Sequence, residues 1–472
     1  MNSASKGKQG AVEATPAEAP ARADLIEVLR RFHYGEPGAA AQTTMPQGGI
    51  LPALLNPYRD ASTIRYQYPL YLAPVDSEEG SVLAKPLTEH LADSVRVFAP
   101  ADEDARILKD NLPWLERYLR DKLQGPDPVD APALFARGVK ALVDHLDLKG
   151  DSRGVLEGNL AALSDGIADG AQFLGYGPDA PLHLLAHAIG YHDERRRALC
   201  REKIDHCTHG LEALLQVERA KGAAKESPRN NEDDPVSQHL DAGVLSGMLG
   251  KRARGSVEMP AERRERIERA LADLESWEDE PVLVRLIGRL QNPWFDQQAF
   301  IEVIASDDPC AAASEIFERD AARFARLFAA LRVATLEIED RYSPDVHDSW
   351  FASFDWQAFS DEELQLVTRI VALVSADHLA GDGLPSFSQL LGSRRPIHII
   401  SWVRAYDNPA VKPGEGPFDA YRFELAYFGV GHRQVVVAQT SAARSDDLLA
   451  GFQCALESNR TSLHLINRGT QT

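Results

Sequence analysis

The chain has 472 residues, of which 44% are hydrophobic and 26% are charged, a composition typical of soluble globular proteins. This length predicts two to four domains with sizeable cores. The formal net charge of −20 argues against a nucleic-acid or anionic-membrane partner, because both would require clustered lysine and arginine.

The sequence gives no sign of a membrane or secreted protein. No apolar run approaches the ~20 residues of a membrane span, and the first residues form a polar tail without the apolar core of a signal peptide. Four cysteines in a chain of this length do not make a disulfide framework. We therefore expect a cytoplasmic protein.

Composition and periodicity divide the chain into four ranges. Residues 1–22 are rich in alanine, proline and glutamate without periodicity, which predicts a disordered tail. Residues 23–125 combine helix and strand patterns, and residues 133–300 have a helical pattern that is interrupted by a polar loop at 220–238. Residues 313–472 begin with a long helix and are expected to form an α/β domain.

From about residue 364 onward, apolar runs alternate with helical stretches. This alternation predicts a parallel sheet, and because the runs are continuously apolar, both faces of the sheet should be covered. The fold class is therefore α/β, a C-terminal parallel sheet with flanking helices after a mainly α-helical region. The expected strands are 366–375, 397–403, 434–439 and 462–466, and the expected helices are 384–392, 418–429 and 445–458.

Polar residues follow the first two of these strands. Asp377 comes directly after the first apolar run and Asp382 follows it closely, while Asn408 lies just after the second run. Open α/β sheets bind ligands at the carboxyl ends of their strands. Carboxylate and amide oxygens are hard ligands that suit a Mg²⁺ ion bridging to phosphates. The pattern therefore suggests a diphosphate cofactor.

Three segments of this region are similar to the motifs of one family. They are Gly381-Asp382-Gly383 after the first strand, Tyr406-Asp407-Asn408-Pro409 after the second, and Val436-Val437-Ala438-Gln439-Thr440 in the third. With them, residues 366–466 resemble the C-terminal thiamine-diphosphate domain of pyruvate:ferredoxin (or flavodoxin) oxidoreductase and of its 2-oxoacid:ferredoxin relatives. That family has Gly-Asp-Gly, Tyr-Ser-Asn-Thr-Gly-Gly-Gln and Tyr-Val-Ala-Gln-Val at these places.

The resemblance implies that the domain binds thiamine diphosphate and Mg²⁺, with Asn408 as one metal ligand. Two positions remain open for the aspartate ligand. Asp382 stands in a literal Gly-Asp-Gly, whereas Asp377 directly ends the strand, where the ligand is geometrically expected. In the second case Gly381 and Gly383 would belong to a turn that lets the next helix approach closely.

The resemblance also implies a function. The chain would be a subunit or fragment of a thiamine-diphosphate-dependent 2-oxoacid (pyruvate-type) oxidoreductase that performs oxidative decarboxylation. The sequence has no Cys-x-x-Cys, so no iron–sulfur cluster is expected on this chain. Electrons would pass to partner subunits that carry such clusters, and to ferredoxin or flavodoxin.

An alternative reading follows from the departures from the family. Pro409 begins a segment that replaces the family's Thr-Gly-Gly-Gln, and the iron–sulfur ligands are missing. These differences favour a non-catalytic scaffold or interaction subunit that retains a degenerate cofactor-binding fold.

A second group of candidate ligands precedes the sheet region. His183 and His187 have the i,i+4 spacing of zinc-binding pairs, and His206 and His209 add further donors. The sequence leaves open whether these histidines bind a metal. The four cysteines are expected to be packed residues: Cys200 and Cys207 on the apolar stripe of a helix, and Cys310 and Cys454 as isolated side chains.

Overall fold

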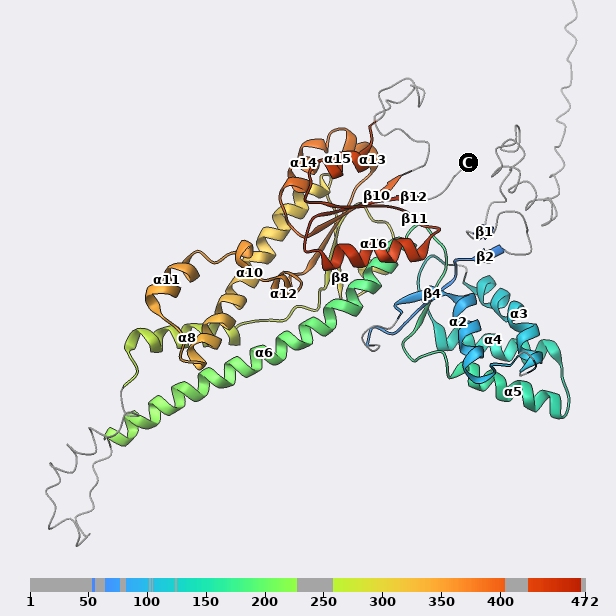
Figure 1. Cartoon of the computed structure of the whole chain (residues 1–472), viewed down its shortest axis with the longest axis horizontal. Helices are drawn as coiled ribbons and strands as arrows, with labels where there is room; N and C mark the ends of the chain where they lie inside the picture. The colour runs from blue at the N-terminus through green and yellow to red at the C-terminus, as the bar shows by residue number, and fades with distance from the viewer. Residues whose placement is uncertain are drawn as a thin grey trace, which may run out of the picture.

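The computed structural model describes residues 53–55, 64–76, 82–101, 103, 105–123, 125–226, 258–403 and 423–467. A parallel sheet with helices on both faces forms the centre, and a smaller, mainly helical unit lies beside it (Figure 1). The expected tail at 1–22 and Asn408 both lie outside the described residues.

Six strands of the described residues form the central sheet, and all of its neighbouring pairs are parallel. This confirms the expected α/β class. Counted along the chain, the strands lie in the order second, first, third, fourth, sixth, fifth. From one edge to the other they are β8 (Ile301–Ile304), β7 (Val284–Gly288), β9 (Arg369–Leu373), β10 (Ile397–Val403), β12 (Ser462–Asn467) and β11 (Val436–Ser441).

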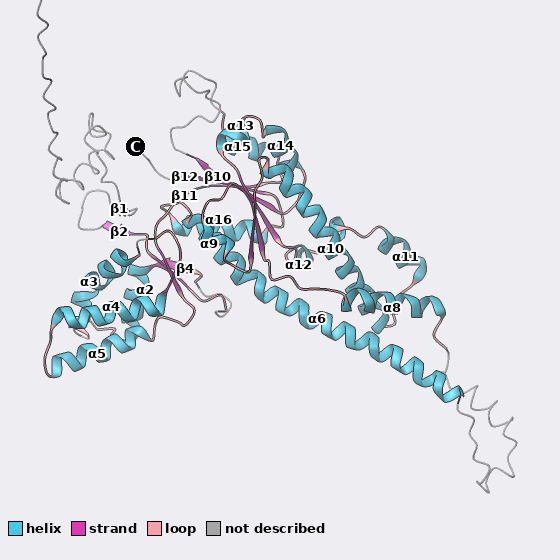
Figure 2. Ribbon diagram, turned by 180° about the vertical axis from the view of Figure 1, so that it is seen from behind, coloured by secondary structure: helices cyan, strands magenta, loops and turns pink. Residues whose placement is uncertain are grey.

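Side chains alternate between the two faces of the sheet, as the strand period requires. In β9, Ile370 and Ala372 belong to one apolar cluster, whereas Val371 and Leu373 belong to another. The first face is covered by α10 (Pro309–Ile338), α13 (Ala376–Ala380), α14 (Leu384–Gly392) and α15 (Leu425–Gly431); the second is covered by α6 (Ala180–Glu226), α9 (Pro293–Asp296) and α16 (Ser445–Glu457) (Figure 2).

The smaller unit combines four helices with an antiparallel sheet. Its apolar core includes Leu91, Leu115, Phe135, Leu160 and Phe173. The sheet has the order β4 (Ala84–Pro86), β3 (Leu70–Leu72), β6 (Gln172–Leu174) and β5 (Val129–Asp130), and the helices are α2 (Leu87–Phe98), α3 (Arg106–Lys122), α4 (Ala131–Leu146) and α5 (Asp151–Ser164). Separately, β1 (Ala53–Leu55) pairs with β2 (Ile64–Tyr66).

One apolar cluster joins the smaller unit to the central sheet. Tyr68 and Leu70 pack in the same cluster as Val371 and Ile466 of the parallel sheet. The hydroxyl of Tyr68 donates a 2.9 Å hydrogen bond to the carbonyl of Ala442. The two parts of the chain therefore share a core.

Long helices extend away from the sheet. Helix α6 has 47 residues, and at 1.5 Å per residue it is about 70 Å long. It packs along α10, where a Cβ on Gly210 would collide with Ile338. Helix α8 (Ala261–Glu275) packs against both α6 and α10, and the 3₁₀ helix η3 (Trp356–Ala358) packs against α10. The remaining helices of this part are α11 (Pro344–Ala352) and α12 (Asp361–Leu364). None of the helices in the described ranges has the length and apolarity to cross a membrane.

Two features differ from the ranges expected from sequence. Strand β7 belongs to the parallel sheet, although it lies within 133–300, the range expected to be helical, and β8 follows it in residues to which no range was assigned. Helix α6 also continues to Glu226, into the range expected to be a loop from residue 220. Short apolar runs fit a strand as well as a buried helix, and the neighbouring helical pattern concealed the two strands.

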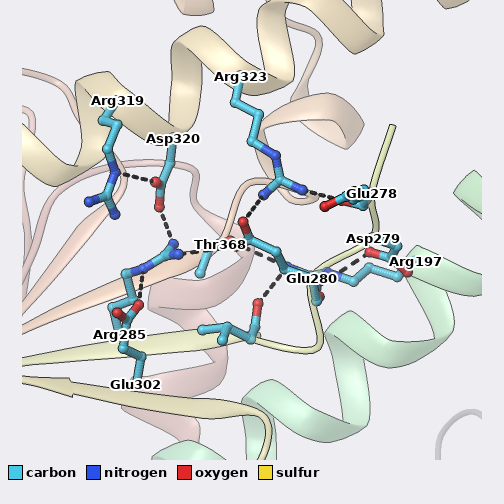
Figure 3. Close-up of polar contacts among 11 residues, drawn as sticks. Arg197, Glu278, Asp279, Glu280, Arg285, Glu302, Arg319, Asp320, Arg323 and Thr368 are labelled. Atoms are coloured by element: carbon cyan, nitrogen blue, oxygen red, sulfur yellow. Dashed lines mark hydrogen bonds and ion pairs between the residues drawn. The ribbon is translucent and has the colours of Figure 1, made fainter. Parts of the chain in front are cut away.

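A network of charges with a buried centre, formed by Arg285 and Asp320, lies at the amino ends of the central strands (Figure 3). Arg285 of β7 contacts Glu302 of β8, Asp320 of α10 and Glu280. Arg197 of α6 donates to the carbonyls of Glu280 and Val282 and to the hydroxyl of Thr368. The network therefore connects the sheet to the helices on both of its faces.

Candidate functional site

A cleft of about 1030 Å³ lies at the carboxyl ends of the central strands. Its lining includes Arg289 to Pro293 after β7, Ser306 and Asp307 after β8, Leu373 to His378 at the end of β9, and Trp402 with Val403 of β10. After β7 the chain continues to β8 on one side, and it later returns to β9 on the other side of β7. The cleft therefore lies at the switch point where open α/β sheets bind ligands.

Gly288 sets how closely β7 and β9 approach at the floor of the cleft. It has a φ of 144°, and a Cβ at this position would lie 2.5 Å from the carbonyl oxygen of Leu373. Only glycine adopts this conformation without strain and without displacing β9.

Asp377 is the predicted site residue that the structure places in the cleft. It lies in the first turn of α13, immediately after β9, and its side chain is exposed. The hydroxyl of Ser375 caps the same helix by accepting a 3.2 Å hydrogen bond from the backbone N–H of His378. The carboxylate of Asp377 is therefore available to a ligand.

The other predicted residues lie elsewhere. Asp382 is exposed in the turn between α13 and α14. Neither it nor the exposed Gly381 nor the buried Gly383 lines the cleft. A Cβ on Gly383 would collide with the ring of His378, so this glycine permits a close approach. Asn408 is outside the described residues, but β10, the strand it follows, contributes Trp402 and Val403 to the lining.

Among the polar residues of the cleft that sequence reasoning missed, Asp127, Asp179 and Asn292 form one group. Asp127 precedes β5, Asp179 precedes α6, and Asn292 is the N-cap of α9. The amide nitrogen of Asn292 donates to Asp127 at 2.8 Å and to Asp179 at 3.2 Å. The spacing of these residues in the sequence does not predict that they are neighbours. They come together only when the smaller unit packs against the sheet.

His183 lies buried beside this group. Its Nε2 atom is 3.4 Å from Asp127 Oδ1, and its ring stacks on Phe295 with centroids 4.6 Å apart. Neither ring nitrogen has a hydrogen-bond partner within the part of the chain that the structure describes. Burial lowers the pKa of His183 to about 4, although the charge of Asp127 opposes this shift, so the ring is neutral near pH 7.

The charge of the cleft lining is mainly negative. Asp127, Asp179, Asp307 and Asp377 all contribute carboxylates, whereas Arg289 is the one arginine in the lining, which contains no lysine. Arg289 forms a 2.6 Å ion pair with Asp307. Within the described ranges, no arginine or lysine forms an ion pair with the other three carboxylates.

The histidines and cysteines of α6 do not form a common site. His206 and His209 are about 23 residues beyond His183, which is roughly 35 Å along the helix. The described residues contain no group of three or more metal-binding side chains. Cys207 and Cys310 are buried and Cys200 is partly buried, as expected, but Cys454 is exposed because it lies on the outer side of α16.

Comparison with known proteins assigns no family: no protein-family model matches the chain, and no curated protein sequence matches it either.

Proposed function

We propose that the chain is the cofactor-binding component of a thiamine-diphosphate-dependent 2-oxoacid oxidoreductase of the pyruvate:ferredoxin type. One observation carries the proposal: Asp377, one of the two candidates for the aspartate ligand of Mg²⁺, lines a large cleft at the switch point of a parallel sheet. The volume of the cleft is sufficient for a ligand of this size.

The cleft chemistry fits a diphosphate only as its metal complex. Asp377, together with Asn408 of the neighbouring strand end, would supply hard oxygen ligands to Mg²⁺. A bare diphosphate would be repelled by the carboxylates of the lining, whereas a bound divalent ion reverses the local charge. We therefore expect binding to depend strictly on Mg²⁺.

The bound cofactor would supply the stabilisation of negative charge that decarboxylation of a 2-oxoacid requires, while the protein orients it and excludes water. The sequence contains no Cys-x-x-Cys. We propose that iron–sulfur clusters on partner subunits receive the electrons and pass them to ferredoxin or flavodoxin.

A non-catalytic scaffold is the second candidate. It is favoured by the lack of any group of three metal-binding side chains among the described residues. The replacement of Thr-Gly-Gly-Gln after Asn408 supports the same function. In this case the subunit retains the sheet and the cleft but binds no cofactor.

Calorimetric titration with thiamine diphosphate, with and without Mg²⁺, distinguishes the two candidates. We expect micromolar, Mg²⁺-dependent binding that is weakened at least tenfold by Asp377→Asn and by Asn408→Ala. Asp382→Asn is the matched control, because this carboxylate lies outside the cleft and its loss should leave binding unchanged. Absence of binding at millimolar cofactor by the folded protein would leave the scaffold as the function.

A further inference from the structure

The hydrogen-bonding capacity of Asp127, Asp179 and Asn292, which we call the acceptor cluster, restricts what can bind there. The amide nitrogen of Asn292 has two hydrogens, and it donates one to each carboxylate. The amide oxygen of Asn292 accepts the backbone N–H of Trp294 at 2.9 Å. The atoms that remain for a ligand are therefore acceptors: the carboxylate oxygens of Asp127 and Asp179 and the second lone pair of the amide oxygen.

The negative charge of the acceptor cluster has no cationic partner among the residues that the structure describes. No lysine or arginine within the described ranges forms an ion pair with Asp127 or Asp179, and the nearby Arg289 pairs with Asp307. Two carboxylates held on one amide repel each other. A bound cation would remove this repulsion.

A second observation points to a ligand at the same place. The side chain of His183 is fully buried and its Nε2 atom is directed at Asp127, but at 3.4 Å it makes no hydrogen bond that meets normal geometry. Leaving buried donors and acceptors without hydrogen bonds lowers the stability of the folded protein. The region is therefore not optimised for the stability of the free protein.

We propose that the acceptor cluster binds a positively charged ligand group that carries several N–H donors, of the amidinium or primary ammonium class. Such a group can donate to Asp127 and to Asp179 at the same time and can replace the charge that the protein lacks. This site is separate from Asp377, and the proposal does not depend on the binding of thiamine diphosphate.

Binding of benzamidine and of benzamide tests the proposal, because the two probes have nearly the same shape and differ in charge. Calorimetric titration of the full chain in the presence of EDTA should show that benzamidine binds at least tenfold more tightly than benzamide. Asp127→Asn and Asp179→Asn should each weaken benzamidine at least tenfold. Asp382→Asn, which removes an exposed carboxylate outside the cleft, should leave the affinity for benzamidine within about twofold.

Equal affinity for the two probes would overturn the proposal, as would an equal loss of benzamidine binding in Asp382→Asn. Circular dichroism establishes whether the variants fold. If Asp127→Asn or Asp179→Asn does not fold, a crystal of the wild-type protein soaked in benzamidine decides. Density for the amidinium between these two carboxylates supports the proposal, and density elsewhere, or none, overturns it.

Discussion

The buried charges at the amino ends of β7 and β9 are paired, whereas carboxylates at the carboxyl ends of the same strands are not. At the amino ends, Arg369 forms bonds of 2.8 and 3.1 Å with Asp193 of α6, and Arg285 contacts three carboxylates. At the carboxyl ends, Asp127 and Asp377 line the cleft without a lysine or arginine partner among the described residues. One end of the sheet is thus organised for stability and the other for a ligand.

The largest expected effect comes from breaking a pair at the amino ends. Asp193→Ala leaves the guanidinium of Arg369, which is 2% exposed, as a buried charge without its partner. Removal of one partner of a buried ion pair costs about 3–5 kcal/mol in the free energy of unfolding. Urea unfolding measures this loss.

Arg153→Ala is the control for that measurement, because it removes an exposed pair with Glu157 on α5. We expect no measurable change in stability, since exposed pairs contribute little. Similar losses in the two variants would contradict the assignment of the amino ends to stability.

Gly288→Ala tests the floor of the cleft. The new side chain would be strained at a φ of 144° and would collide with the carbonyl of Leu373. We expect a loss of about 1–3 kcal/mol in the free energy of unfolding, together with loss of ligand binding in the cleft. Gly158→Ala, at an open position in α5, should instead stabilise the protein by up to about 1 kcal/mol. A Gly288→Ala variant as stable as wild type would refute this role.

Stability should fall as the pH is lowered below 6.5. Burial lowers the pKa of His187 and of His464 to about 4 in the folded protein, so the unfolded chain binds more protons between pH 6.5 and pH 4. Each of these histidines should cost about 2 kcal/mol of stability between pH 6.5 and pH 5. Urea unfolding at both pH values measures the slope, and His464→Gln should reduce it. An unchanged slope in this variant would contradict the prediction.

The smallest effect on stability is expected for Arg289→Ala. The ion pair of Arg289 with Asp307 is exposed, so thermal unfolding should be unchanged. The cleft becomes more negative, however, and benzamidine should bind more tightly than to wild type. Weaker binding of benzamidine would contradict this prediction, because it would show that Arg289 supports binding at the acceptor cluster.

The parts of the fold that could be predicted are those with a local signal. The run from Ile397 to Val403 is mainly apolar and preceded by polar residues, and it forms β10 as expected. Asp377 was identified because a residue that ends such a strand must lie at the carboxyl edge of the sheet. Strand β7 was missed because Val284 to Gly288 directly follows a long helical pattern.

The acceptor cluster could not be predicted for a different reason. Asp127, Asp179 and Asn292 come from three distant segments, and each by itself has an ordinary explanation as a turn or cap residue. Their common role arises only from tertiary packing. A single sequence contains no periodicity that reports it.

The core shared by Tyr68, Leu184 and Val371 has a practical consequence for dissecting the chain. A fragment that begins at residue 258 would contain every strand of the parallel sheet that the structure describes, but it would lack α6 and β3, which cover one of its faces. The exposed apolar face would then be water-accessible and prone to self-association. The sheet is therefore not expected to fold as an isolated fragment, and ligand binding has to be measured with the full-length chain.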